Sequence, residues 1–288
     1  MIRLSNGHQF SYIAASGALA FDGRGWPWEW PLRWIGLLDP LCFTIVTKTL
    51  TRHPRKGTLR WWNPFGCVRF VSGGTVNAVG LTNPGIDWWC RQVGPQIGAS
   101  GLALVGSITD DDPETVGAMA AMLDPFPLNA IEINASCPNT QAEMMRNAEF
   151  VVASVSAVKS ATRHPIILKL SFQQEYVRIA KSCEGLVEAL AINSVPWAMV
   201  YGNRASPLAR LGGGGVSGQA AQPQTWKMVQ ELAAATTIPV IGPSVWEFAD
   251  IEKLRQLGAS AISFGAIFLR YPWRPTSYVR RDRALLPR

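Results

Sequence analysis

Charged residues and histidine are scarce in this 288-residue sequence, and the common metal-binding patterns are missing. Charged residues make up 16% of the chain, and only three residues are histidine. The cysteines are odd in number and widely spaced, with no C-x-x-C pair and no histidine partners at zinc-ligand spacing. We therefore expect no metal site, and free thiols in a reducing compartment. The five cysteines are Cys42, Cys67, Cys90, Cys137 and Cys183.

The sequence also lacks a long hydrophobic run. Its first residues, Met1 to His8, do not have the basic and then apolar layout of a signal peptide. The longest uncharged stretches, such as Gln92–Thr109, are broken by Pro95 and by several glycines, so none supplies the roughly 20 apolar residues that a membrane helix needs. We expect a cytoplasmic protein that makes no use of a membrane.

Hydrophobic residues and tryptophan are abundant instead. The chain is 48% hydrophobic and has 12 tryptophans, which excludes disorder because enough apolar surface is present to offset chain entropy. The net charge of +7 permits a polyanionic partner. Many of the basic residues, however, gather in segments 52–60 and 270–288, which is typical of a solvated loop and a solvated tail. We expect no nucleic-acid partner.

Eight short apolar runs recur at intervals that leave room for one helix between them. Runs that are apolar on both faces are typical of parallel strands covered by helices. The runs are Ser11–Ala15, Phe43–Thr47, Leu102–Ile108, Ala130–Ile133, Ile166–Leu170, Ala189–Ile192, Ile238–Ile241 and Ala261–Phe264.

Helix signals fall between these runs. Asp112 precedes Pro113 and Glu114, which predicts a capped helix that runs to Leu123. Apolar spacing predicts further helices over Gln222–Ala235 and Trp246–Leu257, the second ending at Gly258.

This alternation predicts an α/β fold, a (β/α)8 TIM barrel that forms a single domain over residues 1–288. An open doubly wound sheet is the alternative. The barrel is favoured because polar, chemically rich segments follow nearly every strand, whereas an open sheet concentrates its ligand groups at one switch point.

Polar side chains follow several of the predicted strands. Lys48 comes directly after the second run, and Asn77 to Gly85 form a glycine-broken loop with two amides. After the fourth run, the segment Asn134 to Asn139 carries amides, a serine and Cys137. Asn193 and Ser194 end the sixth run. Turn chemistry and solvated side chains explain such residues one at a time, but their recurrence at strand ends indicates an active face.

Two further features concern anionic ligands. Lys169 lies near the centre of a predicted barrel strand, where a lysine is disfavoured unless it is paired or meets an anion. The glycine run from Gly212 to Gly215, followed by Ser217, has backbone N–H groups that could hold a phosphate, although flexible loops look the same.

Taken together, these segments resemble the dihydroorotate dehydrogenase family. The similarity runs from about Ser11 to Phe268, and its most diagnostic part is Asn134-Ala135-Ser136-Cys137-Pro138-Asn139. The resemblance implies a (β/α)8 barrel that binds FMN and oxidises dihydroorotate to orotate in pyrimidine synthesis. A cysteine at position 137 resembles the class 1 enzymes of the family.

The resemblance also implies roles for individual residues. Cys137 would remove the C5 proton while hydride leaves C6 for flavin N5, and Lys48 would lie between the substrate carboxylate and the flavin. The residues implied for the substrate are Asn83, Asn134, Asn139, Asn193 and Ser194. Those implied for FMN are Ala15, Ser16, Gly17, Lys48, Thr49, Asn134, Lys169, Gly215, Ser217, Ser244, Gly265 and Ala266.

These roles agree with elementary chemistry. Amides donate and accept at once, so they match a cyclic imide without charging the pocket. A thiol must be ionised, at least transiently, to act as a base. A cation beside the flavin N1/C2=O edge stabilises the reduced anionic flavin, which would account for Lys169.

The chain departs from the family pattern after the seventh strand. Pro243 stands where the family continues toward a Gly-Gly turn, and proline has no N–H to donate. We expect the phosphate to be held by Ser244, by Gly265 and Ala266, and by a helix that begins near Trp246. The residues after Cys137 read as a helix in place of a flexible lid. For the Trp-rich stretch 26–31 and the pair Trp61-Trp62 three roles stay open: packing in the core, a wall of the pocket, or a subunit interface.

Two other functions stay open at this point. One is a flavin reductase like the tRNA-dihydrouridine synthases, which the net charge favours but which has no appended RNA-binding domain here. The other is a degenerate, non-catalytic FMN barrel. We also expect a homodimer by analogy, and the electron acceptor is fumarate, a quinone, or NAD reached through a partner subunit.

Overall fold

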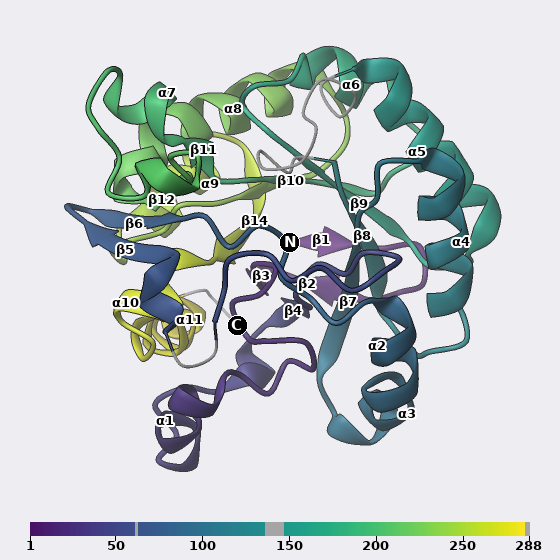
Figure 1. Ribbon diagram of the computed structural model, residues 1–288, viewed down its shortest axis with the longest axis horizontal. Coiled ribbons are helices and arrows are strands. Elements are labelled where there is room, and N and C mark those ends of the chain that lie inside the picture. Colours follow the sequence, from purple (N-terminus) through teal and green to yellow (C-terminus); the bar gives the residue numbers. More distant parts are fainter. Residues whose placement is uncertain (61–62, 136–146, 286–288) are drawn as a thin grey trace.

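Eight parallel strands close into a barrel in this computed structural model, which describes residues 1–60, 63–135 and 147–285 (Figure 1). Each predicted apolar run overlaps one barrel strand, and helices lie between the strands, so the prediction of a (β/α)8 barrel is confirmed. The barrel strands are β3 (Tyr12–Ala14), β4 (Thr44–Val46), β7 (Ala103–Ile108), β8 (Ala130–Asn134), β9 (Ile166–Leu170), β10 (Ala189–Ile192), β13 (Val240–Gly242) and β14 (Ala259–Phe264).

The helices surround this barrel. The helix predicted from Asp112 is α4 (Pro113–Leu123), and the Asp112 carboxylate accepts the Thr115 N–H as an N-cap. The helix predicted over Gln222–Ala235 is α8, with the same bounds. The others are α1 (Trp30–Trp34), α2 (Ile86–Gln92), α3 (Gly94–Ile97), α5 (Ala148–Ala161), α6 (Tyr176–Ser182), α7 (Trp197–Tyr201), α9 (Asp250–Gln256), α10 (Ala266–Arg270) and α11 (Arg274–Leu285).

One predicted helix is wrong in its first four residues. The apolar spacing from Trp246 predicted a helix, but α9 begins four residues later, at Asp250. The Asp250 carboxylate accepts the N–H groups of Trp246 and Glu247, which fixes these residues as a loop. A side chain competing for backbone donors is the physical reason for the shorter helix.

An N-terminal hairpin closes one end of the barrel. Strands β1 (Ile2–Arg3) and β2 (Gln9–Phe10) pair antiparallel. Ile2, Leu4 and Phe10 are buried in one cluster with side chains from the barrel interior, such as Ile13 and Ile167. Water and ligands are therefore kept out at this end, and the opening lies at the other, as in other (β/α)8 barrels.

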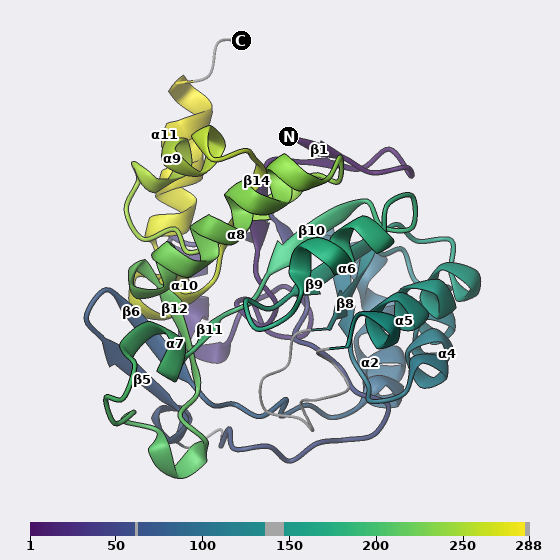
Figure 2. The same ribbon diagram turned by 90° about the horizontal axis from the view of Figure 1, so that it is seen from above.

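A second sheet, which the sequence did not predict, lies at the opposite end of the barrel from the hairpin (Figure 2). Its four antiparallel strands are, in spatial order, β11 (Val195–Pro196), β12 (Gly215–Gly218), β6 (Gly74–Asn77) and β5 (Val68–Val71). They come from the segments after β4 and β10. At Gly74 any Cβ would overlap the Ser217 carbonyl oxygen, so close pairing of β6 with β12 requires glycine there.

None of the helices in the described ranges is long and apolar enough to cross a membrane.

A buried carboxylate fastens the last helix to the barrel. Asp282 of α11 accepts hydrogen bonds from the Tyr12 hydroxyl and from the Arg255 guanidinium, and its side chain is only 7% exposed. Burial alone would raise the pKa of Asp282, but the donors Arg255 and Tyr12 lower it below its ordinary value. This carboxylate therefore joins the barrel strand β3, through Tyr12, and the helix α9, through Arg255, to the last helix.

We predict that Asp282→Ala lowers the free energy of unfolding by about 3 kcal/mol, because Arg255 and Tyr12 lose their shared acceptor. Glu252 also pairs with Arg255, but at 3.7 Å and with a side chain that is 64% exposed. As the matched control, Glu252→Ala should cost less than about 0.5 kcal/mol. Urea unfolding measures both values, and equal costs for the two variants would contradict this account.

Candidate active site

A cavity of about 290 Å³ opens between the carboxyl ends of the barrel strands and the second sheet. Most of the described residues that the family resemblance implied are in its lining. These are Ala15, Ser16, Gly17, Lys48, Lys169, Asn193, Ser194, Ser217, Ser244, Gly265 and Ala266. Most come from loops after five different barrel strands, while Lys169 lies on β9 and Ser217 on β12. A barrel assembles its site in this way from residues far apart in the chain.

Four implied residues are placed elsewhere. Thr49 and Asn134 are buried behind the lining. Thr49 Oγ1 lies 2.9 Å from Ser16 Oγ, which is in the lining, and accepts from Asn134 Nδ2 at 3.1 Å. Gly215 belongs to β12, where any Cβ would overlap Ser194 Oγ. The buried amide of Asn83 bonds to Thr51, Leu81 and Gly85 and so holds its own loop.

Cys137 and Asn139 lie outside the described residues, and so do Trp61 and Trp62. Cys137 follows Asn134, the last residue of β8, by three positions in the chain. The roles that the resemblance implies for Cys137 and Asn139 therefore stay predictions.

A buried ion pair explains the lysine that was anomalous in the sequence. Lys169 Nζ lies 2.9 Å from Glu132 Oε1, and the two side chains are 8% and 2% exposed. Ser107 Oγ donates to the same oxygen at 2.8 Å and lies 2.9 Å from Thr49 Oγ1. The sequence analysis missed Glu132. A signal was present, because an acid two residues before Asn134 points to the same face of its strand.

The cavity lining contains a second group of polar atoms. The N–H groups of Ser244, Val245, Gly265 and Ala266 have no hydrogen-bond partner within the part of the chain that is described, and all four residues line the cavity. Ser217 lies in the same lining. Backbone donors without partners at the loops after the last two strands are typical of a phosphate site in this fold.

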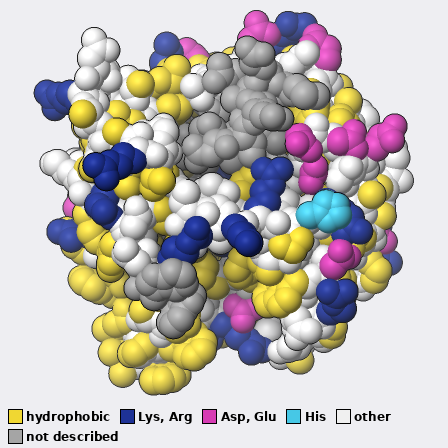
Figure 3. Space-filling view, viewed as in Figure 1, with side chains coloured by type: hydrophobic (Ala, Val, Ile, Leu, Met, Phe, Trp, Pro, Cys, Tyr) yellow, Lys and Arg dark blue, Asp and Glu magenta, His cyan; other side chains and the backbone are white. Residues whose placement is uncertain are grey.

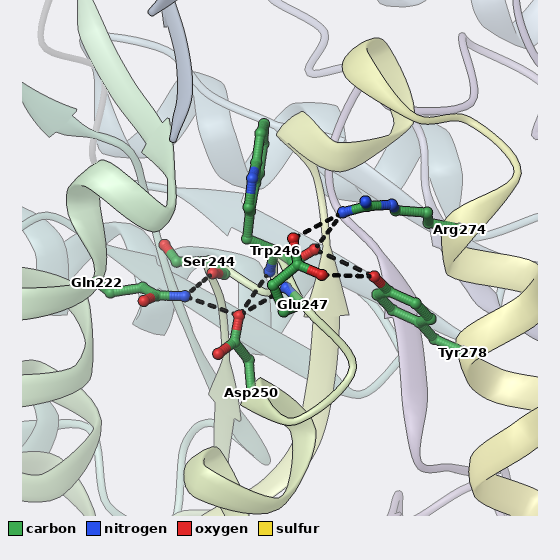
Figure 4. A network of polar contacts seen from close by, with 7 residues as sticks. All are labelled: Gln222, Ser244, Trp246, Glu247, Asp250, Arg274 and Tyr278. Carbon is green, nitrogen blue, oxygen red and sulfur yellow. Dashed lines mark hydrogen bonds and ion pairs between the residues drawn. The ribbon is translucent and has the colours of Figure 1, made fainter. Parts of the chain in front are cut away.

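The loop that carries Ser244 is held from outside the cavity (Figure 4). Ser244 adopts a left-handed conformation with φ of 67°, its carbonyl oxygen accepts from Gln222 Nε2, and its hydroxyl lies 3.0 Å from Thr225 Oγ1. Gln222 also donates to Asp250, which takes the N–H groups of Trp246 and Glu247.

This network corrects one expectation. A helix beginning at Trp246 cannot supply phosphate donors, because α9 starts at Asp250 and the Trp246 N–H is already bonded to the Asp250 carboxylate. The available donors come from Ser244 and Val245 on one loop and from Gly265 and Ala266 on the next.

The Trp-rich segment forms one wall of the cavity. Trp26 and Trp28 both line it, and their rings stack with centroids 5.3 Å apart and planes at 4°. Trp26 Nε1 donates to the Gly17 carbonyl at 3.0 Å, which ties this wall to the first strand loop. Trp30 and Trp34 of α1 are exposed instead, and Figure 3 shows hydrophobic side chains covering the surface at the lower left, where Figure 1 places α1.

Glu29 is hydrogen-bonded to the backbone of this wall. Its Oε2 accepts the Trp26 N–H at 2.7 Å, while its Oε1 is buried without a hydrogen-bond partner in the described ranges. Burial raises the pKa of Glu29 to about 7, although the Trp26 N–H and Arg33 act in the opposite direction. Among the residues that are described, no group of three or more His, Cys, Asp or Glu side chains could hold a metal ion.

We predict that Glu29→Gln stabilises the protein in a pH-dependent way. Since the folded-state pKa lies above the ordinary 4.5, ionisation of Glu29 weakens the folded state as pH rises from 4.5 to about 7. The variant should be more stable by roughly 1–3 kcal/mol near about pH 8 and equal to wild type near about pH 4.5, measured by urea unfolding. A gain that is the same at both pH values would contradict the assignment. Exposed Glu149→Gln is the control and should show no such dependence.

Comparisons with known proteins agree with this geometry. The family model described as "Dihydroorotate dehydrogenase" matches residues 37–273. The catalytic subunits of dihydroorotate dehydrogenase B (NAD(+)) from Bacillus cereus (strain B4264) and Bacillus mycoides (strain KBAB4) are each 31% identical over 282 residues, covering 95% of this chain and 87% of theirs. A ligand-free dihydroorotate dehydrogenase structure from Eimeria tenella shares the fold, with a TM-score of 0.67 at 15% identity over 94% of this chain and 82% of that one. The chain belongs to the dihydroorotate dehydrogenase family.

Proposed function

We propose that this protein binds FMN in the barrel cavity and oxidises dihydroorotate to orotate, with Cys137 as the base. The observation that carries the proposal is the arrangement of the cavity. Lys169 is in its lining, and so are four residues whose N–H groups have no hydrogen-bond partner in the described ranges. The family membership and the similarity to subunits named dihydroorotate dehydrogenase B (NAD(+)) support the same substrate.

The described residues fit FMN. The N–H groups of Ser244, Val245, Gly265 and Ala266 suit a phosphate dianion, and the hydroxyl of Ser217 adds a donor on the facing strand. Lys169 suits the polar pyrimidine edge of the isoalloxazine. Pro243 has no N–H to donate to the phosphate. The N–H groups of Ser244 and Val245, which follow it, have no hydrogen-bond partner in the described ranges and can serve instead.

The flavin, when bound, supplies the hydride-accepting chemistry, which no side chain of the protein can provide. Lys169 would donate to the edge of the ring on which negative charge develops. Ser16 would fix the loop after β3 beside it, because its hydroxyl is bonded to Thr49 and to the Thr47 carbonyl.

The substrate would be held by uncharged groups and one cation. Asn193 and Ser194 follow β10 in the lining, and Asn134 at the end of β8 is hydrogen-bonded to Thr49. Lys48 lines the same cavity and would meet the carboxylate of dihydroorotate. It would also favour the thiolate form of Cys137 electrostatically, which a base of ordinary thiol acidity requires. We propose Asn83 and Asn139 as further amides for the ring, with Asn83 acting through the loop that it holds.

The relatives also bear on the electron acceptor. Their names describe catalytic subunits of an NAD(+) enzyme. We propose that this chain likewise passes electrons to a separate partner subunit, that it forms a homodimer, and that it works in the cytoplasm.

We predict that the protein purifies with FMN, or takes up FMN, and that anaerobic dihydroorotate bleaches the flavin. Cys137→Ala should retain FMN and slow this reduction by about 100-fold or more, because it removes the base. Stopped-flow absorbance measures the rate.

Cys90→Ser is the matched control. Cys90 is half-buried on α2 with its thiol near the Met122 carbonyl, and serine can make the same contact, so the rate should not change. An unchanged rate in Cys137→Ala would contradict the assignment of the base. A flavin that dihydrouridine-containing RNA reduces and dihydroorotate does not would favour the tRNA-dihydrouridine reaction, and protein that cannot take up FMN would favour a non-catalytic barrel.

A further inference from the structure

Glu132 is a buried charge that the proposed reaction does not use. It lies on β8 with a side chain that is 2% exposed, and it is not part of the cavity lining, whereas its partner Lys169 is. Burying a charge in this way costs free energy unless it is paired and hydrogen-bonded. Its position therefore calls for an explanation in terms of what it does to Lys169.

The strand register sets the pair inside the barrel. Ala130 and Ile167 belong to the cluster of the barrel interior, and side chains two residues apart on a strand share a face. Glu132 and Lys169 follow these residues by two positions on adjacent strands, so both point inward. Glu132 is closed off from the cavity, whereas Lys169 reaches the cavity lining.

The contacts at Glu132 fix the ammonium of Lys169. Glu132 Oε1 accepts from Lys169 Nζ at 2.9 Å and from Ser107 Oγ at 2.8 Å. Lysine has three N–H donors. Within the described ranges the only hydrogen bond of Lys169 Nζ is the one to Glu132, so two donors remain for a ligand in the cavity.

We infer that Glu132 is a positioning residue that holds Lys169 against the flavin and offsets its charge, so that Glu132 limits how strongly the site stabilises anionic forms of the flavin. This inference rests on the proposed binding of FMN. Lys169 without Glu132 would present an uncompensated cation in a site of low dielectric constant, where charge acts strongly.

Sulfite affinity tests the inference without relying on turnover, because sulfite adds to flavin N5 and leaves negative charge on the ring. Glu132→Gln in the FMN-bound protein should bind sulfite about tenfold more tightly than wild type. Loss of packing alone would weaken the adduct or release FMN, so tightening distinguishes the charge effect from a structural one. Unchanged or weaker sulfite binding with FMN retained would overturn the inference.

Two controls separate charge from hydrogen bonding. Ser107→Ala removes one donor to Glu132 and leaves both charges, so sulfite affinity should stay within about threefold of wild type. Exposed Glu149, paired with exposed Arg178, allows the same change of net charge at a distance. Glu149→Gln should leave the affinity unchanged.

A second set of variants covers the case in which Glu132→Gln does not fold. Lys169→Gln leaves Glu132 as the uncompensated charge and should weaken sulfite binding by about tenfold, and the double variant should return to within about threefold of wild type. Equal affinities in Lys169→Gln and the double variant would overturn the inference. Wild-type protein that binds no FMN would refute the proposed function, a result distinct from either of these.

Discussion

The buried pair of Lys169 and Glu132 is the constraint around which the site is built. The barrel interior is apolar below the pair, where the hairpin of β1 and β2 closes one end with Ile2, Leu4 and Phe10. Above it lies the cavity. Two charges this deep are tolerated because each is the other's partner and because Ser107 adds a hydrogen bond to the carboxylate. The pair thus lies between the apolar core of the barrel and the cavity.

Two parts of the backbone hold the rest of the site, namely the barrel strands and the loops that follow them. The barrel strands β9 and β8 hold Lys169 and Asn134, and Thr49 lies three residues after β4. The loops after β13 and β14 present N–H groups to the cavity, and they keep their shape because side chains outside it take the remaining hydrogen bonds. Asp250 is the clearest case, since its carboxylate accepts the N–H groups of Trp246 and Glu247 and leaves those of Ser244 and Val245 available.

The barrel was predictable because its strands carry strong local signals. Each is a short apolar run between polar loops, and the N-cap at Asp112 and the apolar spacing of α8 depend only on neighbours in the chain. The start of α9 was not predictable in this way, because the hydrogen bonds of Asp250 to a preceding loop override the apolar spacing from Trp246. The second sheet was also missed, since β5, β6, β11 and β12 are only two to four residues long and the pairing of β6 with β12, which joins its two halves, spans more than a hundred positions.

The site was predictable to the extent that its residues stand at strand ends and match a family motif. Glu132 was missed because an acid within an apolar strand was not considered together with Lys169 on the next strand. The wall formed by Trp26 and Trp28 could not be assigned, because stacking against a cavity depends on where α1 and its flanking turn pack. Asn83 illustrates the converse. It is a motif position whose amide is bonded to Thr51 and Gly85 and does not line the cavity.

The most direct test of the account is a crystal structure of the protein with FMN bound. The account predicts a phosphate that accepts hydrogen bonds from the backbone of Ser244, Val245, Gly265 and Ala266, and an isoalloxazine ring whose pyrimidine edge contacts Lys169 Nζ. A phosphate bound elsewhere, or a ring that does not contact Lys169, would contradict it.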